Sequence, residues 1–342
     1  MSDFDVVVAG AGVAGTATAL QIHTLGLRVA VLGRPDIPAG YESLAPAAVH
    51  MLTSMSIGGC VPLPEIVAWW GDTGEHHVHL PDARVVEKKL LVESLRERAA
   101  EVGIKQFTLT GRFELQRADG LWCLRDSHAL QGGATLRSTY LVDATGRASV
   151  IGRYLGARRI AFDSLASISF QINNPLVVGV WTESTADGWW NACCGSNGGM
   201  LSFFSSPQAI RESRRNISRY LEPARKIRSL FHLLPDPSSV PVIRLCSSSF
   251  LTPAAGVGWR AVGDAAWTGQ PLASAGVAKA LRDAHLVGQT LRGDDRNYHR
   301  GQTTEFVSYF HQLRRHYELE SRWTTTPFWR DRRDKFVDLA IQ

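Results

Sequence analysis

The sequence predicts an α/β protein in which a doubly wound domain is interrupted by a second, β-sheet-based domain and followed by a C-terminal helix. Three glycine-anchored motifs that follow one another along the chain support this: Gly10-Ala11-Gly12-Val13-Ala14-Gly15, Asp143-Ala144-Thr145-Gly146-Arg147 and Gly263-Asp264-Ala265. An apolar run at Val6–Ala9 before the first motif is typical of a buried parallel strand, and helical spacing over Val13–Leu25 follows it. The order of strand, tight turn and helix indicates the first unit of a doubly wound sheet.

The glycines of the first motif have separate uses in a dinucleotide site. Gly10 permits the tight turn, Gly12 lets backbone N–H groups approach a pyrophosphate, and Gly15 lets the helix and strand pack closely. This motif alone leaves open a tight turn without a ligand. Together with the two later motifs it indicates a site for FAD, in which Asp264 would bind the ribityl hydroxyls and the following helix would point its positive end at the isoalloxazine.

The second strand, Arg28–Leu32, does not end on the acidic residue that usually contacts the adenosine ribose. Gly33 and Arg34 occupy that position. A plain NAD site is therefore disfavoured, and Asp36 or a backbone group is expected to serve the ribose instead.

The remaining elements follow from periodicity. Apolar spacing predicts an amphipathic helix over Leu90–Val102, an antiparallel meander between Phe113 and Asp143, a helix over Ala275–Leu291 and one long aromatic-rich helix from Tyr298 to Trp329. Short apolar strands are expected at Ser167–Ile172, Val177–Thr182 and Met200–Phe204. The predicted division is an FAD-binding domain made of residues 1–155 and 250–295, a substrate domain at 156–249, and a C-terminal helical segment at 296–342.

Composition limits the class of protein. A chain of 342 residues, 44% hydrophobic and 20% charged, can bury a large core, and it contains no apolar run long enough to span a membrane. Its five cysteines are an odd number without metal-ligand spacing, so we expect reduced thiols, no metal and a cytoplasmic protein. The histidines His76, His77 and His79 lack the accompanying ligands of a metal site, and Cys193-Cys194 is expected to be a buried thiol pair rather than a redox pair.

The net charge of +5 is concentrated in two arginine-rich stretches, Arg211–Arg228 and Arg314–Lys335. Each is interpreted as a solvated helix face, or alternatively as a surface for an acidic substrate or protein partner. Nucleic acid is not expected, because no recognised binding module accompanies the charge.

Further segments point to a known family. They are Gly40-Tyr41-Glu42-Ser43-Leu44-Ala45-Pro46, Trp70-Gly71, Gly188-Trp189-Trp190, Pro271 to Val277, and Glu320-Ser321-Arg322-Trp323 followed by Pro327-Phe328-Trp329. With the three glycine motifs, the chain resembles the flavoprotein monooxygenases of the single-component aromatic hydroxylase type. It is most similar to their branch of flavin-dependent tryptophan halogenases and flavoproteins of tryptophylquinone-cofactor biogenesis.

The resemblance implies an FAD-dependent monooxygenase that hydroxylates an electron-rich aromatic, an indole or a peptidyl tryptophan, through a flavin hydroperoxide. NAD(P)H or an external flavin reductase would supply electrons. The residues expected to bind FAD are Gly10, Gly12, Val13, Ala14, Gly15, Arg34, Glu42, Ser43, Lys88, Gly263, Asp264, Pro271, Ala275, Gly276 and Val277. Those expected to border the substrate are Trp70, Trp189 and Trp190, and no catalytic acid or base can be named.

The chain departs from the family pattern at several positions. The halogenase motif Gly-Trp-x-Trp-x-Ile-Pro is matched only in its opening Gly188-Trp189, and the halogenase lysine has no counterpart, so halogenation is disfavoured. Lys88 replaces a common arginine, Gln270 a usual aspartate and Ala275 a common glutamine. The alternatives to a monooxygenase are a flavin-dependent halogenase, a reductase of the same fold, and a flavin-binding partner without catalysis.

Overall fold

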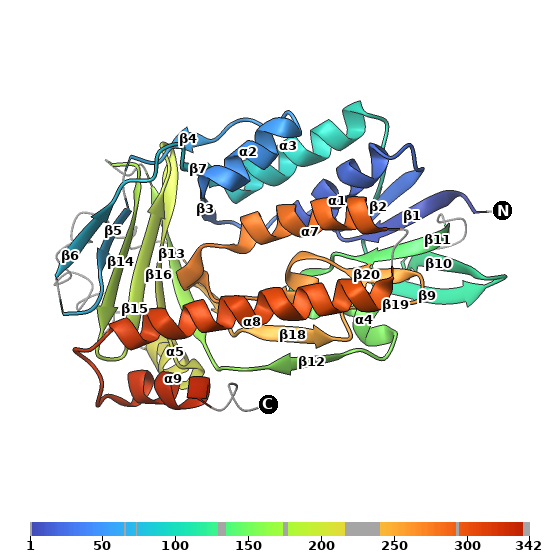
Figure 1. The fold of residues 1–342 in the computed structure, drawn as a ribbon. Coiled ribbons are helices and arrows are strands. Elements are labelled where there is room, and N and C mark those ends of the chain that lie inside the picture. The colour runs from blue at the N-terminus through green and yellow to red at the C-terminus, as the bar shows by residue number, and fades with distance from the viewer. Residues whose placement is uncertain are drawn as a thin grey trace.

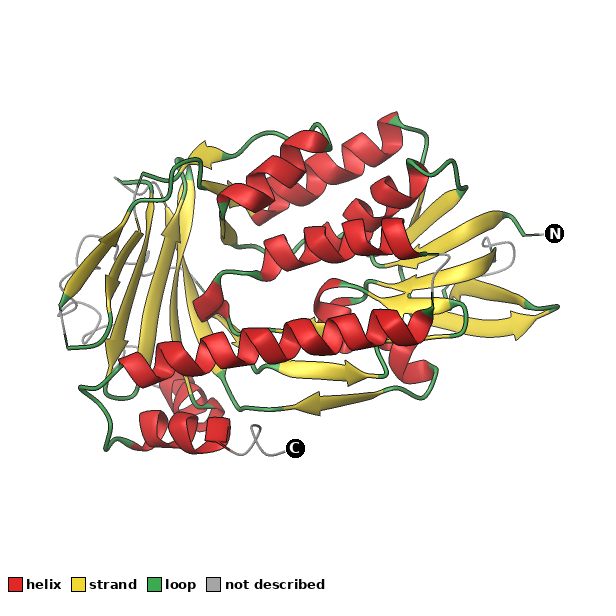
Figure 2. Cartoon of the chain, in the orientation of Figure 1, coloured by secondary structure: helices red, strands yellow, loops and turns green. Residues whose placement is uncertain are grey.

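The computed structural model describes residues 2–64, 66–72, 74–128, 135–173, 177–215, 240–291 and 294–337. Two large sheets lie toward opposite ends of the molecule, with helices α1, α2, α3 and α7 grouped on one side and α8 running between the two ends (Figures 1 and 2). This mixed α/β arrangement confirms the predicted fold class.

The eight-stranded sheet carries the glycine motifs. Its path in space is β19 (Ala255–Gly256), β20 (Trp259–Ala261), β11 (Leu136–Asp143), β1 (Phe4–Ala9), β2 (Val29–Gly33) and β8 (Lys105–Thr108). The strand pairs from β20 to β8 are parallel. The predicted meander is present, because β9 (Phe113–Ala118) and β10 (Leu121–Asp126) extend β11 by antiparallel pairing.

Helices cover this sheet with the faces that the apolar spacing predicted. They are α1 (Val13–His23), α3 (Lys88–Glu101) and α7 (Gly276–Thr290), and α1 packs against both of the others. In α3 the buried positions include Leu91, Leu95 and Ala99, as expected from their spacing. The strand β1 enters α1, and β20 leads toward α7, so both helix N-termini lie at the same edge of the sheet.

The second sheet has seven strands. In spatial order they are β17 (Val242–Leu245), β13 (Ala166–Asn173), β16 (Gly198–Ser205), β15 (Gly188–Cys194), β14 (Gly179–Thr185), β5 (Ile66–Trp69) and β6 (Glu75–Val78). The three strands expected from the sequence are β13, β14 and β16. However, β5 and β6 come from residues 66–78, which the sequence division placed in the FAD-binding domain. Each is only four residues long, too short for its periodicity to reveal it.

Smaller elements join the two sheets. One three-stranded sheet contains β12 (Arg158–Ala161), β18 (Ser249–Thr252) and β21 (Trp267–Thr268), and the other β3 (Tyr41–Leu44), β7 (Arg84–Glu87) and β4 (Val61–Pro62). Short helices α2 (Pro46–Ser54), α4 (Val150–Tyr154) and α5 (Pro207–Arg215) complete the described chain before its C-terminal segment. Most of the basic stretch Arg211–Arg228 lies outside the described residues.

The C-terminal segment forms two helices where the sequence predicted one. The first, α8 (Asp295–Leu319), begins at Asp294, whose side chain accepts a hydrogen bond from the Arg296 backbone, and the second is α9 (Pro327–Val337). The backbone of Glu320 is extended, which ends α8. Pro327 lacks the N–H that a helix interior needs but suits the first position of a helix, where α9 begins. Aromatic side chains of α8, among them Phe306 and Tyr317, are buried against the core.

Candidate active site

The first glycine motif folds as predicted at the end of β1, and the structure separates its roles. A Cβ on Gly10 would lie 2.2 Å from the Ala144 carbonyl oxygen, and one on Gly15 would lie 1.9 Å from the Gly10 carbonyl oxygen. A Cβ on Gly12 would meet no described atom within 4 Å. Gly10 and Gly15 are therefore required by the packing of the chain itself, whereas Gly12 faces open space at the N-terminus of α1.

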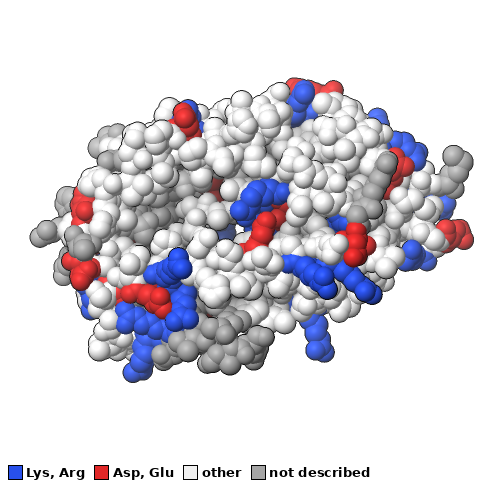
Figure 3. All heavy atoms as spheres, in the orientation of Figure 1, with Lys and Arg blue, Asp and Glu red and all other residues white. Residues whose placement is uncertain are grey.

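Two adjoining cavities meet at Gly12. The outer cavity, of 610 Å³, lies over the ends of β1 and β2, and the inner cavity, of 450 Å³, lies between the N-terminus of α7 and the seven-stranded sheet. The space-filling view shows this face hollowed between that sheet and the helices (Figure 3). Both cavities are lined by Gly12, Val13, Lys88, Ala144 and Gly146.

The outer cavity is bordered by cations. Asp36, the ribose candidate, and Arg34, also expected to bind FAD, both line it, together with Arg96 and Arg112. Arg96 on α3 donates to the carbonyl oxygens of Ala11, Arg34 and Pro35 and so fixes the loops on both sides of the cavity. Sequence reasoning missed Arg96, although it lies one turn after Val92 on the helix that it had predicted.

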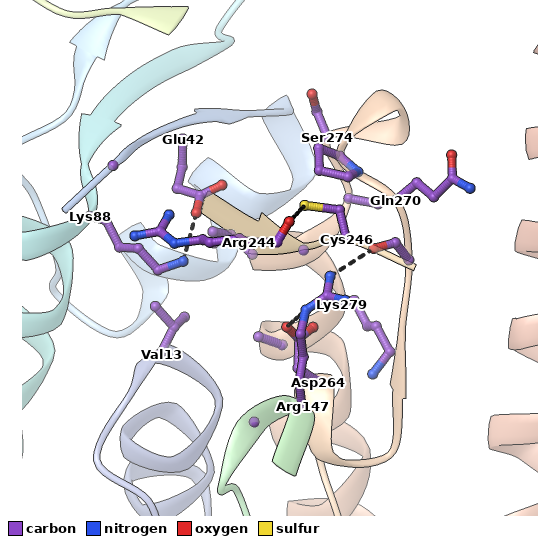
Figure 4. A pocket seen from close by; sticks show the side chains of 18 of the residues that line it. Val13, Glu42, Lys88, Arg147, Arg244, Cys246, Asp264, Gln270, Ser274 and Lys279 are labelled. Atoms are coloured by element: carbon purple, nitrogen blue, oxygen red, sulfur yellow. Dashed lines mark hydrogen bonds and ion pairs between the residues drawn. The ribbon is translucent and has the colours of Figure 1, made fainter. Parts of the chain in front are cut away.

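The second motif supplies a turn between the cavities. Burial raises the pKa of Asp143, whose carboxylate accepts hydrogen bonds from Thr145 and from the Gly152 backbone and thereby holds the turn. Arg147, at the end of the motif, lines the inner cavity and donates to the carbonyl oxygens of Ser247 and Gly269. Its Nε lies 3.8 Å from Asp264 Oδ2 (Figure 4).

The third motif brings Asp264 to the inner cavity and places a buried lysine behind it. Lys279 Nζ donates to the Gly263 carbonyl oxygen at 2.8 Å and to Asp283 Oδ2 at 2.7 Å, and it lies over the Trp267 ring. Asp283 also accepts from the Gly263 backbone N–H. Gly263 has a positive φ of 56°, and a Cβ there would lie 2.5 Å from the Ala14 side chain, so it serves packing rather than lining.

Lys88 pairs with Glu42 at the junction of the cavities. Lys88 Nζ lies 2.9 Å from Glu42 Oε1 (Figure 4). The charge of Glu42, acting against desolvation, raises the pKa of Lys88. Among the other residues predicted to bind FAD, those that line the inner cavity are Ala14, Ser43, Asp264, Pro271, Ala275, Gly276 and Val277.

The wall of the inner cavity opposite Asp264 is one face of the seven-stranded sheet. It carries small and mostly polar side chains, namely Ser167, Ser169, Val180, Asn191, Cys193, Met200 and Ser202, with Phe204 beside them. Ser202 Oγ donates to Ser169 Oγ at 2.8 Å. Burial raises the pKa of Cys193 and raises that of Cys194 to about 12, which fits the expected unreactive thiols rather than a redox pair.

The three tryptophans expected to border the substrate line neither cavity. Trp189 and Trp190 are 1% and 2% exposed. Trp189 stacks on Phe204, and Trp190 packs at a tilt against Phe203 on the opposite face of the sheet. Trp70 donates to the His316 carbonyl oxygen and packs edge-on against Trp329 of α9. Trp70 and Trp189 belong to the cluster that contains Tyr317 and Trp329 of the C-terminal helices, whereas Trp190 packs in the cluster on the other face of the sheet. The structure therefore places none of the three at either cavity. Phe204, on which Trp189 stacks, does line the inner cavity.

Two exclusions concern the described residues alone. Within them no group of three or more His, Cys, Asp or Glu side chains is arranged to hold a metal ion. The same part of the chain has no helix with the length and apolarity needed to cross a membrane.

Comparisons with known proteins agree with the resemblance in the sequence. No protein-family model matches the chain. A protein named as an FAD-dependent oxidoreductase, LodB of Marinomonas mediterranea, is 25% identical over 363 residues, covering 97% of each chain. The solved structure of QhpG, described as a peptidyl tryptophan dihydroxylase essential for tryptophylquinone cofactor biogenesis, superposes with a TM-score of 0.80 at 22% identity, covering 97% of this chain and 79% of that one.

Halogenases share the fold as well. The myxobacterial chondrochloren halogenase CndH superposes with a TM-score of 0.80 at 19% identity, covering 98% of this chain and 89% of that one. The flavin-dependent halogenase CmlS gives a TM-score of 0.77 at 19% identity, covering 99% of this chain and 70% of that one. The chain is thus a relative of the FAD-dependent oxidoreductases with the fold of the flavin-dependent hydroxylases and halogenases, which confirms the resemblance seen in its sequence.

Proposed function

We propose that this protein is an FAD-dependent monooxygenase that hydroxylates an electron-rich aromatic group, an indole and specifically a tryptophan side chain within a peptide. The observation that carries the proposal is that the two cavities adjoin. An outer cavity suited to a dinucleotide shares Gly12, Lys88 and Gly146 of its lining with an inner cavity large enough for an aromatic side chain.

The residues present fit FAD. The space in front of Gly12 and the unpaired first-turn N–H groups of α1, which no side chain caps, suit a pyrophosphate. Arg34, Arg96 and Arg112 would balance its charge along the outer cavity. Asp264 would accept hydrogen bonds from the ribityl hydroxyls, and the loop Pro271–Ala275 with the N-terminus of α7 would border the isoalloxazine.

Reduced FAD would supply the two electrons and the activation of O2. Hydroxylation then inserts one oxygen atom into an aromatic C–H bond, and the second leaves as water with two protons. The chain contributes a site that binds and orients the aromatic group against the serine-rich wall and limits its contact with water. The hydroxyl groups of Ser167, Ser169 and Ser202 offer acceptors for an indole N–H.

The peptidyl substrate is supported by likeness to QhpG, whose described substrate is a peptidyl tryptophan. Likeness to LodB over almost the whole chain supports an FAD-dependent oxidoreductase and no particular substrate. Halogenation is less well supported. Besides the departures in the sequence, the cavity-lining Lys279 is held by Asp283 and the Gly263 carbonyl, which leaves its ammonium committed within the protein.

The test is to incubate the FAD-loaded protein with ¹⁸O2, with either NAD(P)H alone or NAD(P)H plus a flavin reductase, and with three substrates in parallel: a tryptophan-containing peptide, free tryptophan and a simple phenol. We expect a mass gain of ¹⁸O in the peptide. Gain only in the phenol would refute the indole substrate. In a parallel reaction with bromide, products with a bromine isotope pattern would favour the halogenase alternative, and flavin oxidation without any product would refute monooxygenation. Comparing the two electron-donor arms identifies the donor.

A further inference from the structure

A buried chain of polar contacts connects the C-terminal helix α9 to the loop beside the inner cavity. Arg332 on α9 and Asp163, in the connection between β12 and β13, have side chains 2% and 1% exposed, with Arg332 Nη1 at 3.6 Å from Asp163 Oδ1. Arg332 Nη2 also donates to the Ser164 carbonyl oxygen. The other oxygen of the same carboxylate, Asp163 Oδ2, accepts a hydrogen bond of 2.8 Å from Gln270 Nε2.

Gln270 is held at both ends of its side chain and by its backbone. Its Oε1 accepts from the Tyr317 hydroxyl at 2.6 Å, and its backbone N–H donates to the Tyr309 hydroxyl at 2.6 Å. Both tyrosines lie on α8. The side chain points away from the cavity side chains around it (Figure 4). Only an amide satisfies this position, because one end must donate to a carboxylate while the other accepts from a hydroxyl.

The residues after Gln270 line the inner cavity. Pro271–Ala273 form one 3₁₀ turn, Ser274 has a positive φ of 44°, and α7 begins at Gly276. No side chain caps α7, so the N–H groups of its first turn depend on the loop before it for their direction. The position of Gln270 therefore sets the position of these donors.

Stability alone does not account for the ion pair behind Gln270. Burying two charges costs desolvation free energy that their attraction seldom exceeds, and an apolar pair of similar size usually serves packing equally well. We propose that Gln270, oriented by Asp163 and Arg332, is a positioning residue that fixes the loop Pro271–Ala275 and the N-terminus of α7 against the flavin, and so sets FAD affinity and the ease of FAD reduction. This inference rests on the FAD binding in the proposed function.

The test exchanges the hydrogen-bond donor and acceptor between Gln270 and Asp163. Gln270→Glu keeps the shape of the side chain but removes the Nε2 donor and places a second carboxylate against that of Asp163. We expect FAD to bind about 10- to 100-fold more weakly, as for loss of a hydrogen bond to a buried charge, and the reduction potential of the bound flavin to become more negative. In Gln270→Glu/Asp163→Asn the donor and acceptor change places and the net charge beside Arg332 is kept. The Ser248 backbone N–H, which also donates to Asp163 Oδ2, loses its acceptor, so both properties should return part of the way toward wild type.

Glu320→Gln provides the matched control. Glu320 is a second buried carboxylate of the C-terminal segment, and it binds Gly71, Ser184 and Arg322 rather than the cavity loop. This variant should lower Tm without changing FAD affinity or potential. All measurements are made below the lowest Tm, with folding checked by circular dichroism.

The outcomes separate the two proposals. If Gln270→Glu leaves FAD binding unchanged, or if the double variant recovers neither FAD affinity nor reduction potential, the positioning role of Gln270 is refuted. The proposed function is not affected by either result. A loss of affinity equal to that in Glu320→Gln would also refute the positioning role, because general destabilisation would then explain both. Failure of the wild-type protein to bind FAD would refute the proposed function itself.

Discussion

Lys88 Nζ lies 2.9 Å from Glu42 Oε1 at the junction of the outer and inner cavities. Because the Glu42 charge raises the pKa of Lys88, the ammonium stays protonated at neutral pH. Glu42 lies on β3 and Lys88 is the first residue of α3, so the pair also joins these two elements. Because Lys88 lines both cavities, its positive charge would attract the phosphates of a dinucleotide bound there.

Lys88→Met should weaken FAD binding about tenfold, because it removes the cation and leaves the Glu42 carboxylate unpaired beside an anionic ligand. Lys88→Arg, which keeps the charge, should bind FAD at least as well as wild type. Titration of the apoprotein by quenching of FAD fluorescence measures both. Equal affinities for all three proteins would place Lys88 outside the binding site.

Gly12→Val should abolish FAD binding while the protein still folds. The added side chain would enter the open space at the N-terminus of α1, where its Cβ would have no protein atom within 4 Å. Gly15→Val is the contrasting variant, since its Cβ would collide with the Gly10 carbonyl and folding should fail. Circular dichroism and visible flavin absorbance check the pair. A yellow, folded Gly12→Val protein would contradict the assigned motif.

Ser169→Phe should fill the inner cavity from the wall opposite Asp264. Because Ser169 lies on the cavity face of β13, the ring would displace an aromatic substrate, and kcat/KM should fall at least about 100-fold by loss of the productive geometry. Flavin absorbance should be retained. Ser169→Ala keeps the space and removes only one of the three serine hydroxyls, so it should have a much smaller effect on kcat/KM. Unchanged kcat/KM in the phenylalanine variant would show that the substrate binds elsewhere.

Glu320→Gln should lower stability at neutral pH by about 1–3 kcal/mol, the cost of unsatisfying a buried hydrogen-bonded charge. Burial alone would raise the pKa of Glu320, but hydrogen bonds from Arg322, Ser184 and the Gly71 backbone outweigh it and hold the pKa below its usual value. The stabilisation is therefore full above the unfolded pKa, about 4.3, and is lost as the pH falls through the lower, folded pKa. Urea unfolding of both proteins from pH 7 to pH 3 should show the difference shrinking only in acid; a constant difference would contradict the assignment.

The turn of the first glycine motif and the meeting of the three motifs could be predicted from the sequence because their signals are local. The turn between β1 and α1 requires glycine at set positions, which Gly10, Gly12 and Gly15 occupy. The three motifs follow parallel strands and therefore meet at one edge of the sheet. The spacing of Leu91, Leu95 and Ala99 likewise fixed the buried face of α3.

The residues around the inner cavity and the orientation of the tryptophans could not be predicted in the same way. Trp189 and Trp190 are adjacent, so they point to opposite faces of β15, and nothing local tells which face packs against the C-terminal helices. The roles of Arg96 and Lys279 depend on partners that are distant in the sequence and so cannot be recognised from it. The Ala11 carbonyl is 85 residues from Arg96, and the Gly263 carbonyl is 16 residues from Lys279. Gln270 looked like a change at the reactive face, yet its side chain bonds to Asp163, 107 residues away.

The strands β5 and β6, which leave the first part of the chain to join the seven-stranded sheet, have a consequence for engineering. A chimera that imported the substrate wall of a related protein by exchanging one continuous stretch around β13–β16 would lose the parallel pairing of β5 with β14. A viable graft would carry residues 66–78, the β13–β16 region and β17 together. The tail would have to come too, since Glu320 holds the Gly71 backbone at the end of β5. To alter the cavity wall in this fold, several segments that are separate in the sequence have to be exchanged together, or single residues of the serine-rich wall substituted.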